Sequence, residues 1–148
     1  MKPPGSAMDI EIGASLAEMA RLHDAADAFL QDAAADERTR FAVLFTIEEI
    51  VCNIIGYAHD DRNPHAIRLH FEHGAEAIAV EVVDDGRPFD PSAQPPVDTG
   101  LAPEQRPLGG LGIFITRGLA SDMSYRREGR HNRLSLRFDR PGRLREKI

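Results

Sequence analysis

The chain has 148 residues, a formal net charge of −6, 42% hydrophobic residues and 28% charged residues. This composition is typical of one soluble globular domain, and the acidic balance argues against direct binding to nucleic acid. The single cysteine excludes a disulfide framework and a zinc site built on several cysteines. Because the sequence contains no apolar span of about 20 residues and no basic, apolar leader, we expect a cytoplasmic protein without a membrane anchor.

The first third of the chain is predicted to contain a strand and a helix. Residues 1–7 are expected to be a flexible start, and residues 8–12 alternate weakly, like a short edge strand. Ser15 and Glu18 have the spacing of a capping box, at the start of a helix predicted to extend to about Ala34. Apolar residues recur three and four positions apart along this helix, so one of its faces should be buried.

The organising element is a second helix within residues 41–59, which are largely apolar and contain no proline. Asp36 is its expected N-cap, Glu37 lies in its first turn, and the helix should end near Tyr57. Since apolar side chains cover most of its circumference, the helix is expected to be buried. Cys52, which lies within it, is expected to be a buried and inert thiol.

Two predicted hairpins occupy the rest of the chain. The predicted segments are, in order, strands at 65–73 and 77–83, a sharp turn at 84–91, a loop at 92–108, a helix at 113–120, and strands at 121–127 and 133–138. The proline-rich loop is predicted to be a lid over a ligand, because long loops inside compact domains are usually functional. The domain should occupy residues 8–140, with a polar tail at 141–148.

The order of these elements favours an α+β fold over a doubly wound one. Helices cluster early, and the strands pair as hairpins instead of alternating with helices. We therefore expect a two-layer sandwich in which helices cover one face of a single mixed sheet. The histidines show no spacing typical of metal ligands, and His70 and His73, near one strand end, are expected to be solvated.

A polar stripe on the second helix, made of Thr46, Glu49, Asn53 and Gly56, contains the first candidate site residues. Glu49 and Asn53 are four positions apart, so their side chains share a helix face. An amide oxygen suits Mg²⁺, and a nearby carboxylate can accept a proton from an attacking hydroxyl. The alternative is a polar stripe that faces solvent. Glu48 is a rival carboxylate, but it lies away from Asn53 on the helical wheel, so we expect it at a helix edge or in an ion pair.

A second candidate site lies at the end of the strand that precedes the sharp turn. Asp84 is followed by Gly86, and a carboxylate at a strand end can accept a hydrogen bond from the exocyclic amine of adenine. Glycine lets the backbone approach a ligand closely. The alternative is a simple Asp-Gly turn without a ligand.

A third candidate site is the glycine-rich run Gly109-Gly110-Leu111-Gly112, which leads into the short third helix. Free N–H groups and the helix dipole at such a start favour phosphate. The run is not a lysine-bearing P-loop, since no Gly-Lys-Ser/Thr follows, and no strand precedes it as the dinucleotide fingerprint requires. The alternative is a flexible hinge.

Together, the three motifs resemble the nucleotide-binding boxes of the GHKL (histidine kinase-like) ATPase superfamily. Within it, the Phe89-Asp90-Pro91 and Asn132-Arg133-Leu134 stretches are similar to bacterial anti-sigma factor serine/threonine kinases of the RsbW/SpoIIAB type. The resemblance covers about residues 10–138 and implies the Bergerat (GHKL) ATP-binding fold. Pro88 replaces a second glycine that many superfamily members carry, which agrees with the small anti-sigma branch.

The resemblance implies a role for each motif residue, with ATP and Mg²⁺ as cofactors. Asn53 would hold Mg²⁺, and Glu49 would be the general base. Asp84 would bind the adenine amine, and Gly86 would shape its pocket. The backbone that would wrap the phosphates belongs to the glycine-rich run, namely Gly109, Gly110, Leu111 and Gly112. Arg106, in the predicted lid, would either reach a phosphate or face solvent.

The resemblance also implies partners. An enzyme of this kind would phosphorylate a serine on an anti-anti-sigma factor, which is a STAS-domain protein, and would sequester a sigma factor, usually as a homodimer. The alternative is a nucleotide-binding anti-sigma or phosphorelay module without kinase activity. We expect no direct contact with nucleic acid or with a membrane.

Overall fold

The computed structural model describes residues 6–57, 63–93 and 110–141. Nearly all of the expected flexible start, of the predicted lid and of the polar tail lies outside these ranges. The elements are, in order, β1 (Ala7–Gly13), the 3-10 turn η1 (Leu16–Glu18), α1 (Met19–Asp32), α2 (Glu37–Tyr57), β2 (Ala66–His73), β3 (Ala77–Asp84), the 3-10 turn η2 (Pro91–Ala93), α3 (Gly110–Leu119), β4 (Asp122–Glu128) and β5 (His131–Asp139).

The five strands form one sheet in the order β1-β2-β3-β5-β4, with β1 at one edge, as expected. Every adjacent pair is antiparallel, so the prediction of a mixed sheet was wrong. A single helix between two neighbouring strands would leave the strands parallel. Here two elements intervene, α1 and α2 between β1 and β2, and α3 and β4 between β3 and β5. The additional reversal of the chain makes both of these strand pairs antiparallel.

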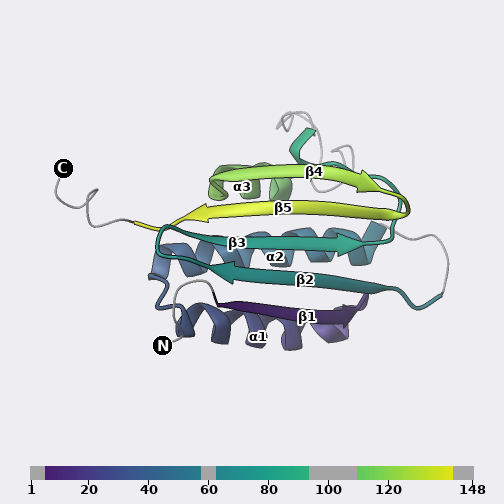
Figure 1. The fold of residues 1–148 in the computed structure, drawn as a ribbon. Coiled ribbons are helices and arrows are strands. Elements are labelled where there is room, and N and C mark those ends of the chain that lie inside the picture. Colours follow the sequence, from purple (N-terminus) through teal and green to yellow (C-terminus); the bar gives the residue numbers. More distant parts are fainter. Residues whose placement is uncertain (1–5, 58–62, 94–109, 142–148) are drawn as a thin grey trace.

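The helices cover one face of the sheet, which confirms the predicted α+β sandwich of two layers (Figure 1). In this view α1 lies behind β1, α2 behind the middle of the sheet, and α3 behind β4 and β5. Alternate strand residues point toward the helices and are buried, because successive side chains of a strand project to opposite faces. The core includes Ile67, Leu69 and Phe71 of β2, Val80 and Val82 of β3, Leu134, Leu136 and Phe138 of β5, and Phe29, Ile47 and Ile113 of the helices.

His73 belongs to the buried set, so the prediction that it is solvated was wrong. It is 4% exposed and packs edge-on against Phe29, with ring centroids 5.5 Å apart. It follows Phe71 by two positions on β2, which places both rings on the helix-covered face. His70 lies on the opposite face, between Asp9 and Glu72.

The start of α1 differs from the predicted capping box. Ser15 makes no side-chain capping bond, and a 3-10 turn separates it from the helix. The Glu18 carboxylate instead accepts hydrogen bonds from the backbone N–H of Gly13, at 3.1 Å, and from Arg21. These bonds hold the pKa of Glu18 at about 2, with the Arg21 side chain as the largest cause.

The outer surface of α2 is not buried, so the prediction for Cys52 was wrong. The helix packs on the sheet and lies beside both other helices, which leaves its outermost arc open. Cys52 is exposed on this arc, and Phe41 is 58% exposed there. An apolar circumference therefore did not distinguish complete from partial burial. None of the helices within the described ranges is long and apolar enough to cross a membrane.

Candidate active site

A cavity of about 320 Å³ opens between α2, α3 and the adjacent ends of β3 and β5. Its lining is largely apolar and includes Ile50, Ile54, Val82, Phe89, Ile113 and Leu134. A few polar residues also line it, namely Asn53, Asp84, Arg87, Tyr125 and Asn132. Apolar walls with a small number of placed polar groups are typical of pockets for small organic ligands, and a flat heteroaromatic ring suits this lining.

Asp84 is the last residue of β3 and lines the cavity. It is 4% exposed, and its Oδ2 accepts hydrogen bonds from the backbone N–H of Gly86, at 2.8 Å, and from Nδ2 of Asn132, at 3.2 Å. Within the described residues both bonds end on Oδ2, so Oδ1 is the oxygen that can accept from a ligand. The predicted Asp-Gly turn is therefore present, and its carboxylate also lines the cavity.

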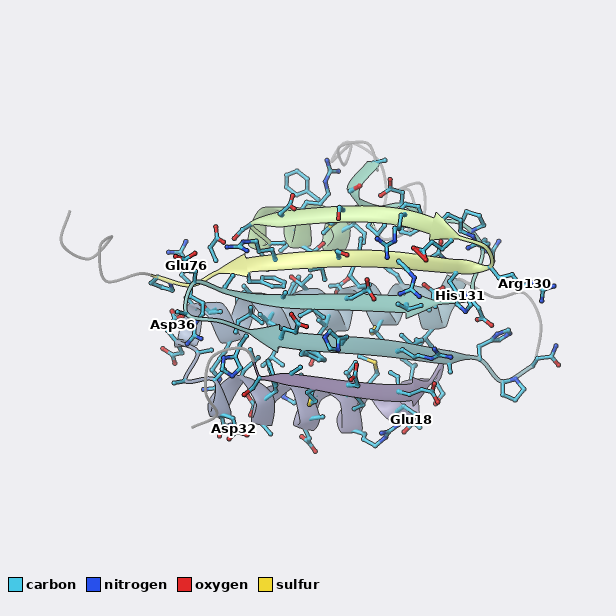
Figure 2. All side chains as sticks on the ribbon, viewed as in Figure 1. Glu18, Asp32, Asp36, Glu76, Arg130 and His131 are labelled. Atoms are coloured by element: carbon cyan, nitrogen blue, oxygen red, sulfur yellow. The ribbon has the colours of Figure 1, made fainter. Side chains whose placement is uncertain are left out.

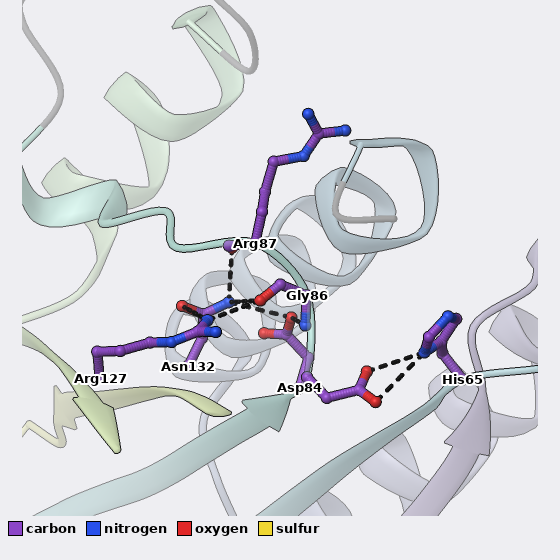
Figure 3. Close-up of polar contacts among 7 residues, drawn as sticks. His65, Asp84, Gly86, Arg87, Arg127 and Asn132 are labelled. Carbon is purple, nitrogen blue, oxygen red and sulfur yellow. Dashed lines mark hydrogen bonds and ion pairs between the residues drawn. The ribbon is translucent and has the colours of Figure 1, made fainter. Parts of the chain in front are cut away.

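Three residues of the hairpin formed by β4 and β5, Tyr125, Arg127 and Asn132, surround Asp84, and the sequence had not assigned them to the site. Figure 3 shows Arg127 and Asn132 beside Asp84. The Asn132 side chain contacts Asp84 and the loop after β3, while Tyr125 and Arg127 donate hydrogen bonds to its Oδ1. The sequence contained a signal for Asn132, because it begins the period-two alternation of β5, which continues with buried residues two, four and six positions later. That pattern places a polar amide on the buried face of β5.

The Asn53 side chain, on α2, reaches the cavity from the helix layer. Its Nδ2 is buried and has no hydrogen-bond partner among the described residues, and the same is true of Oγ1 of Thr46. The polar stripe therefore points inward at Thr46 and Asn53, which excludes the solvent-facing alternative for these two side chains. Gly56, in the same predicted stripe, is exposed.

Glu49 lies at the seam between α2 and α3. A methyl group built on Gly112 would overlap Oε2 of Glu49 and lie 2.7 Å from its Cδ. The carboxylate thus occupies the space that a side chain at position 112 would fill. Glu48 faces the other way, and its Oε1 lies 2.5 Å from Nδ1 of His23 on α1. This ion pair confirms the expected separation of the two adjacent acids and raises the pKa of His23.

The glycine-rich run begins α3, which starts at Gly110 and not at residue 113 as predicted. Gly110, Leu111 and Gly112 therefore form the first helical turn, where backbone N–H groups have no partner inside the helix. Gly109, Arg106 and the predicted lid lie outside the described residues. The described part of the run places a potential anion site beside the Glu49 carboxylate.

These residues fit a nucleotide and a magnesium ion. The Asn53 amide, whose buried Nδ2 has no partner among the described residues, offers an oxygen for Mg²⁺, since the amide oxygen and nitrogen can exchange positions by rotation. The described residues contain no group of three or more His, Cys, Asp or Glu side chains that could hold a metal ion on their own. Mg²⁺ needs few protein ligands when phosphate oxygens supply its remaining ligands.

One curated relative is the serine/threonine-protein kinase BtrW of Bordetella bronchiseptica. It is 29% identical to this chain over 101 residues, which are 67% of this chain and 70% of the relative. A crystal structure of the RsbU and RsbW domains of Rv1364c from Mycobacterium tuberculosis is also similar, with a TM-score of 0.62. That match has 18% identity and covers 95% of this chain, which spans about a third (34%) of the solved chain, so it establishes the fold alone.

The family comparison covers both layers of the sandwich and all three candidate motifs. The family model described as the histidine kinase-like ATPase domain matches residues 12–138. This range runs from the last residues of β1 to the next-to-last residue of β5 and contains Glu49, Asn53, Asp84 and the glycine-rich run. The chain therefore belongs to the histidine kinase-like ATPase domain family.

Proposed function

We propose that this protein is a Mg²⁺-dependent serine kinase that uses ATP to phosphorylate a STAS-domain anti-anti-sigma factor and that also sequesters a sigma factor. The observation that carries the proposal is the position of the Glu49 carboxylate against Gly112, in the first turn of α3. These two residues directly precede Ile50 and Ile113, which line the cavity. A proton acceptor next to a phosphate-binding helix start is what transfer to a hydroxyl requires. The serine/threonine-protein kinase BtrW, the curated relative, supports this class of reaction.

Each motif residue has a defined part in this proposal. Asp84 accepts a hydrogen bond from the adenine amine through Oδ1, and the apolar lining holds the ring. Asn53 provides the protein ligand for Mg²⁺, which when bound neutralises charge on the phosphates. The N–H groups of the first turn of α3 bind phosphate oxygens. The ATP-binding domain occupies residues 8–140 and works as a homodimer.

Glu49 carries the chemistry in this proposal. It orients the acceptor serine and takes the hydroxyl proton while the serine oxygen bonds to the γ-phosphorus and ADP leaves. Transfer of this kind depends mainly on positioning and electrostatic stabilisation, so the carboxylate needs a defined place. The packing of Glu49 against Gly112 supplies that place.

The test is phosphoryl transfer from ATP and Mg²⁺ to a STAS-domain protein encoded in the same genome. Glu49→Gln should reduce transfer about 100-fold or more, because general-base catalysis contributes about 10²- to 10⁴-fold, while ATP affinity stays within about twofold. Glu48→Gln is the matched control. The carboxylate of Glu48 pairs with His23, so its replacement should leave transfer intact. Asn53→Ala should abolish the Mg²⁺ dependence of ATP binding.

The outcomes separate the alternatives. Wild-type protein that binds ATP but transfers no phosphate would instead be a nucleotide-binding anti-sigma or phosphorelay module. Undiminished transfer by Glu49→Gln would overturn the role of this carboxylate. Absence of ATP binding, or Mg²⁺-dependent binding that persists in Asn53→Ala, would overturn the site assignment.

A further inference from the structure

Three polar side chains stand in a row across the end of the sheet. Asp84 of β3 is directly opposite Asn132 of β5, and Asn132 is directly opposite Arg127 of β4. Tyr125 precedes Arg127 by two positions, which places both side chains on the same face of β4. Asp84 and Asn132 of this row line the cavity together with Tyr125, so these three residues form one corner of the candidate nucleotide pocket.

The orientation of the Asn132 amide is determined by its neighbours (Figure 3). The Arg127 guanidinium can only donate, and its Nη1 lies 3.1 Å from Oδ1 of Asn132. The Tyr125 hydroxyl donates to the same oxygen at 2.5 Å. A rotated amide would turn its NH₂ group toward the guanidinium, which has no acceptor. Oδ1 of Asn132 must therefore face Tyr125 and Arg127 of β4.

The other half of the amide holds the loop after β3. Its Nδ2 lies 3.2 Å from Oδ2 of Asp84, 3.0 Å from the backbone oxygen of Arg87 and 3.4 Å from that of Gly86. All three atoms can only accept hydrogen bonds. The backbone oxygen of Gly86 also accepts from Nη1 of Arg127, at 2.6 Å. Asn132 is 6% exposed, so water cannot readily replace these bonds.

We propose that Asn132, held by Tyr125 and Arg127, is the positioning residue that makes the pocket select a purine with an amino group at carbon 6 over one with an oxo group. The proposal rests on the proposed function, because it requires a purine nucleotide in the cavity. With Oδ2 of Asp84 engaged by Asn132 and Gly86, Oδ1 is presented to the base as an acceptor. An amino group donates to that oxygen, whereas an oxo group places two acceptors face to face.

The test compares the Kd values of ATP and inosine triphosphate, which has an oxo group at carbon 6. Wild-type protein should prefer ATP. Asn132→Ala should weaken ATP binding about tenfold, equivalent to the loss of about one hydrogen bond, while inosine triphosphate binding changes by less than about twofold. Asn132→Asp should reduce the preference further, because it directs a carboxylate oxygen at Asp84.

Two further variants make the test specific. Tyr125→Phe removes the hydroxyl that donates to Oδ1 of Asn132 and should lower the preference for ATP by about threefold. This variant also tests the inference if Asn132→Ala fails to fold. Ser135→Ala, on the opposite face of the same strand, is the matched control and should leave the preference unchanged. Thermal unfolding without nucleotide reports any loss of stability separately.

The failures of the two proposals are distinguishable. If the variants weaken ATP and inosine triphosphate binding equally, Asn132 is a structural residue and the inference is overturned. An unchanged preference in Asn132→Ala and Tyr125→Phe overturns it as well. Wild-type protein that binds neither nucleotide overturns the proposed function and, with it, the ligand on which the inference depends.

Discussion

The contact between Glu49 and Gly112 joins two motifs that are more than sixty positions apart in the sequence. The glycine has no side chain, so the carboxylate of Glu49 can lie against the first turn of α3. The nearest obstacle to a larger residue is the end of a flexible side chain and not backbone. A substitution at this position should therefore move the carboxylate more than it disturbs the fold.

Gly112→Ala tests this contact directly. We expect a change of less than about 1 kcal/mol in the free energy of unfolding, because alanine is favourable in a helix and Glu49 can swing aside. Under the proposed function, phosphoryl transfer should nevertheless fall about 100-fold, because small displacements of a general base are costly. Thermal unfolding and a transfer assay on the same preparation measure the two effects.

Gly118→Ala is the matched control in the same helix. Apart from its chain neighbours and the nearby backbone of α3, no atom of the described residues lies within 4 Å of a methyl group built on Gly118, so the substitution should stabilise α3 and leave transfer unchanged. Equal transfer by Gly112→Ala and Gly118→Ala would show that the position of Glu49 against α3 does not matter for the reaction.

At the scale of single elements, the end of α1 contains a feature that can be improved. The N–H of Ala35 bonds to the carbonyl of Leu30 at 3.0 Å, and the N–H of Ala34 to that of Gln31 at 2.9 Å, which is the Schellman pattern. Ala34 occupies its left-handed position, with φ of 54°, where glycine is usual. Arg140 donates to the carbonyls of Ala33 and Ala34 and so ties this helix end to the end of β5.

Ala34→Gly should raise the stability of the protein. The left-handed conformation costs about 1–2 kcal/mol for a residue with a side chain, and glycine loses about 0.5–1 kcal/mol more backbone entropy on folding, so the net gain is about 0.5–1 kcal/mol. The measurement is the free energy of unfolding in urea. Ala28→Gly, at an exposed position inside the same helix, should lower stability by about 1 kcal/mol. The same sign for both substitutions would contradict the assigned conformation.

At the scale of the whole molecule, the two faces of the sheet have different characters. One face is covered by helices, and the other carries exposed side chains (Figure 2). Ion pairs on this open face cross neighbouring strands, such as Arg68–Glu11 and Arg133–Glu81. His70 is part of this polar face, with Nε2 2.9 Å from Glu72 and Nδ1 2.6 Å from Asp9. Glu81 stands opposite it on β3. The hydrogen bonds to Glu72, and then to Asp9, raise the pKa of His70 above its ordinary value of 6.5.

The contribution of His70 to stability should depend on pH. Because its pKa is higher in the folded state than in the unfolded state, the stabilisation is fully present below pH 6.5 and is lost as the pH rises through the folded-state pKa. Wild type should therefore exceed His70→Gln in melting temperature at pH 5.5, and the difference should shrink by pH 9. High salt at pH 5.5 should reduce the same difference, since these side chains are exposed. A difference that grows with pH would contradict the raised pKa.

The sequence by itself predicted the architecture and most of the candidate site. Period-two and period-3.6 patterns indicated the helices and strands because they report which face of each element avoids water. The wheel position of Glu49 separated it from Glu48 before any contact was known, since the geometry of a helix is local. The motifs at Asp84 and before α3 were recognised for the same reason, because each lies within a few consecutive residues.

Only the tertiary structure determined how segments that are distant in the sequence contact one another. The antiparallel direction of every strand pair, the exposure of Cys52 and the packing of Gly112 against Glu49 depend on how elements meet, and no local pattern contains this information. The row of Asp84, Asn132 and Arg127 arises from strand register across β3, β5 and β4, which brings together residues separated by more than forty positions. A sequence pattern reports which face a side chain occupies, whereas only the packed sheet reports which side chains become its neighbours.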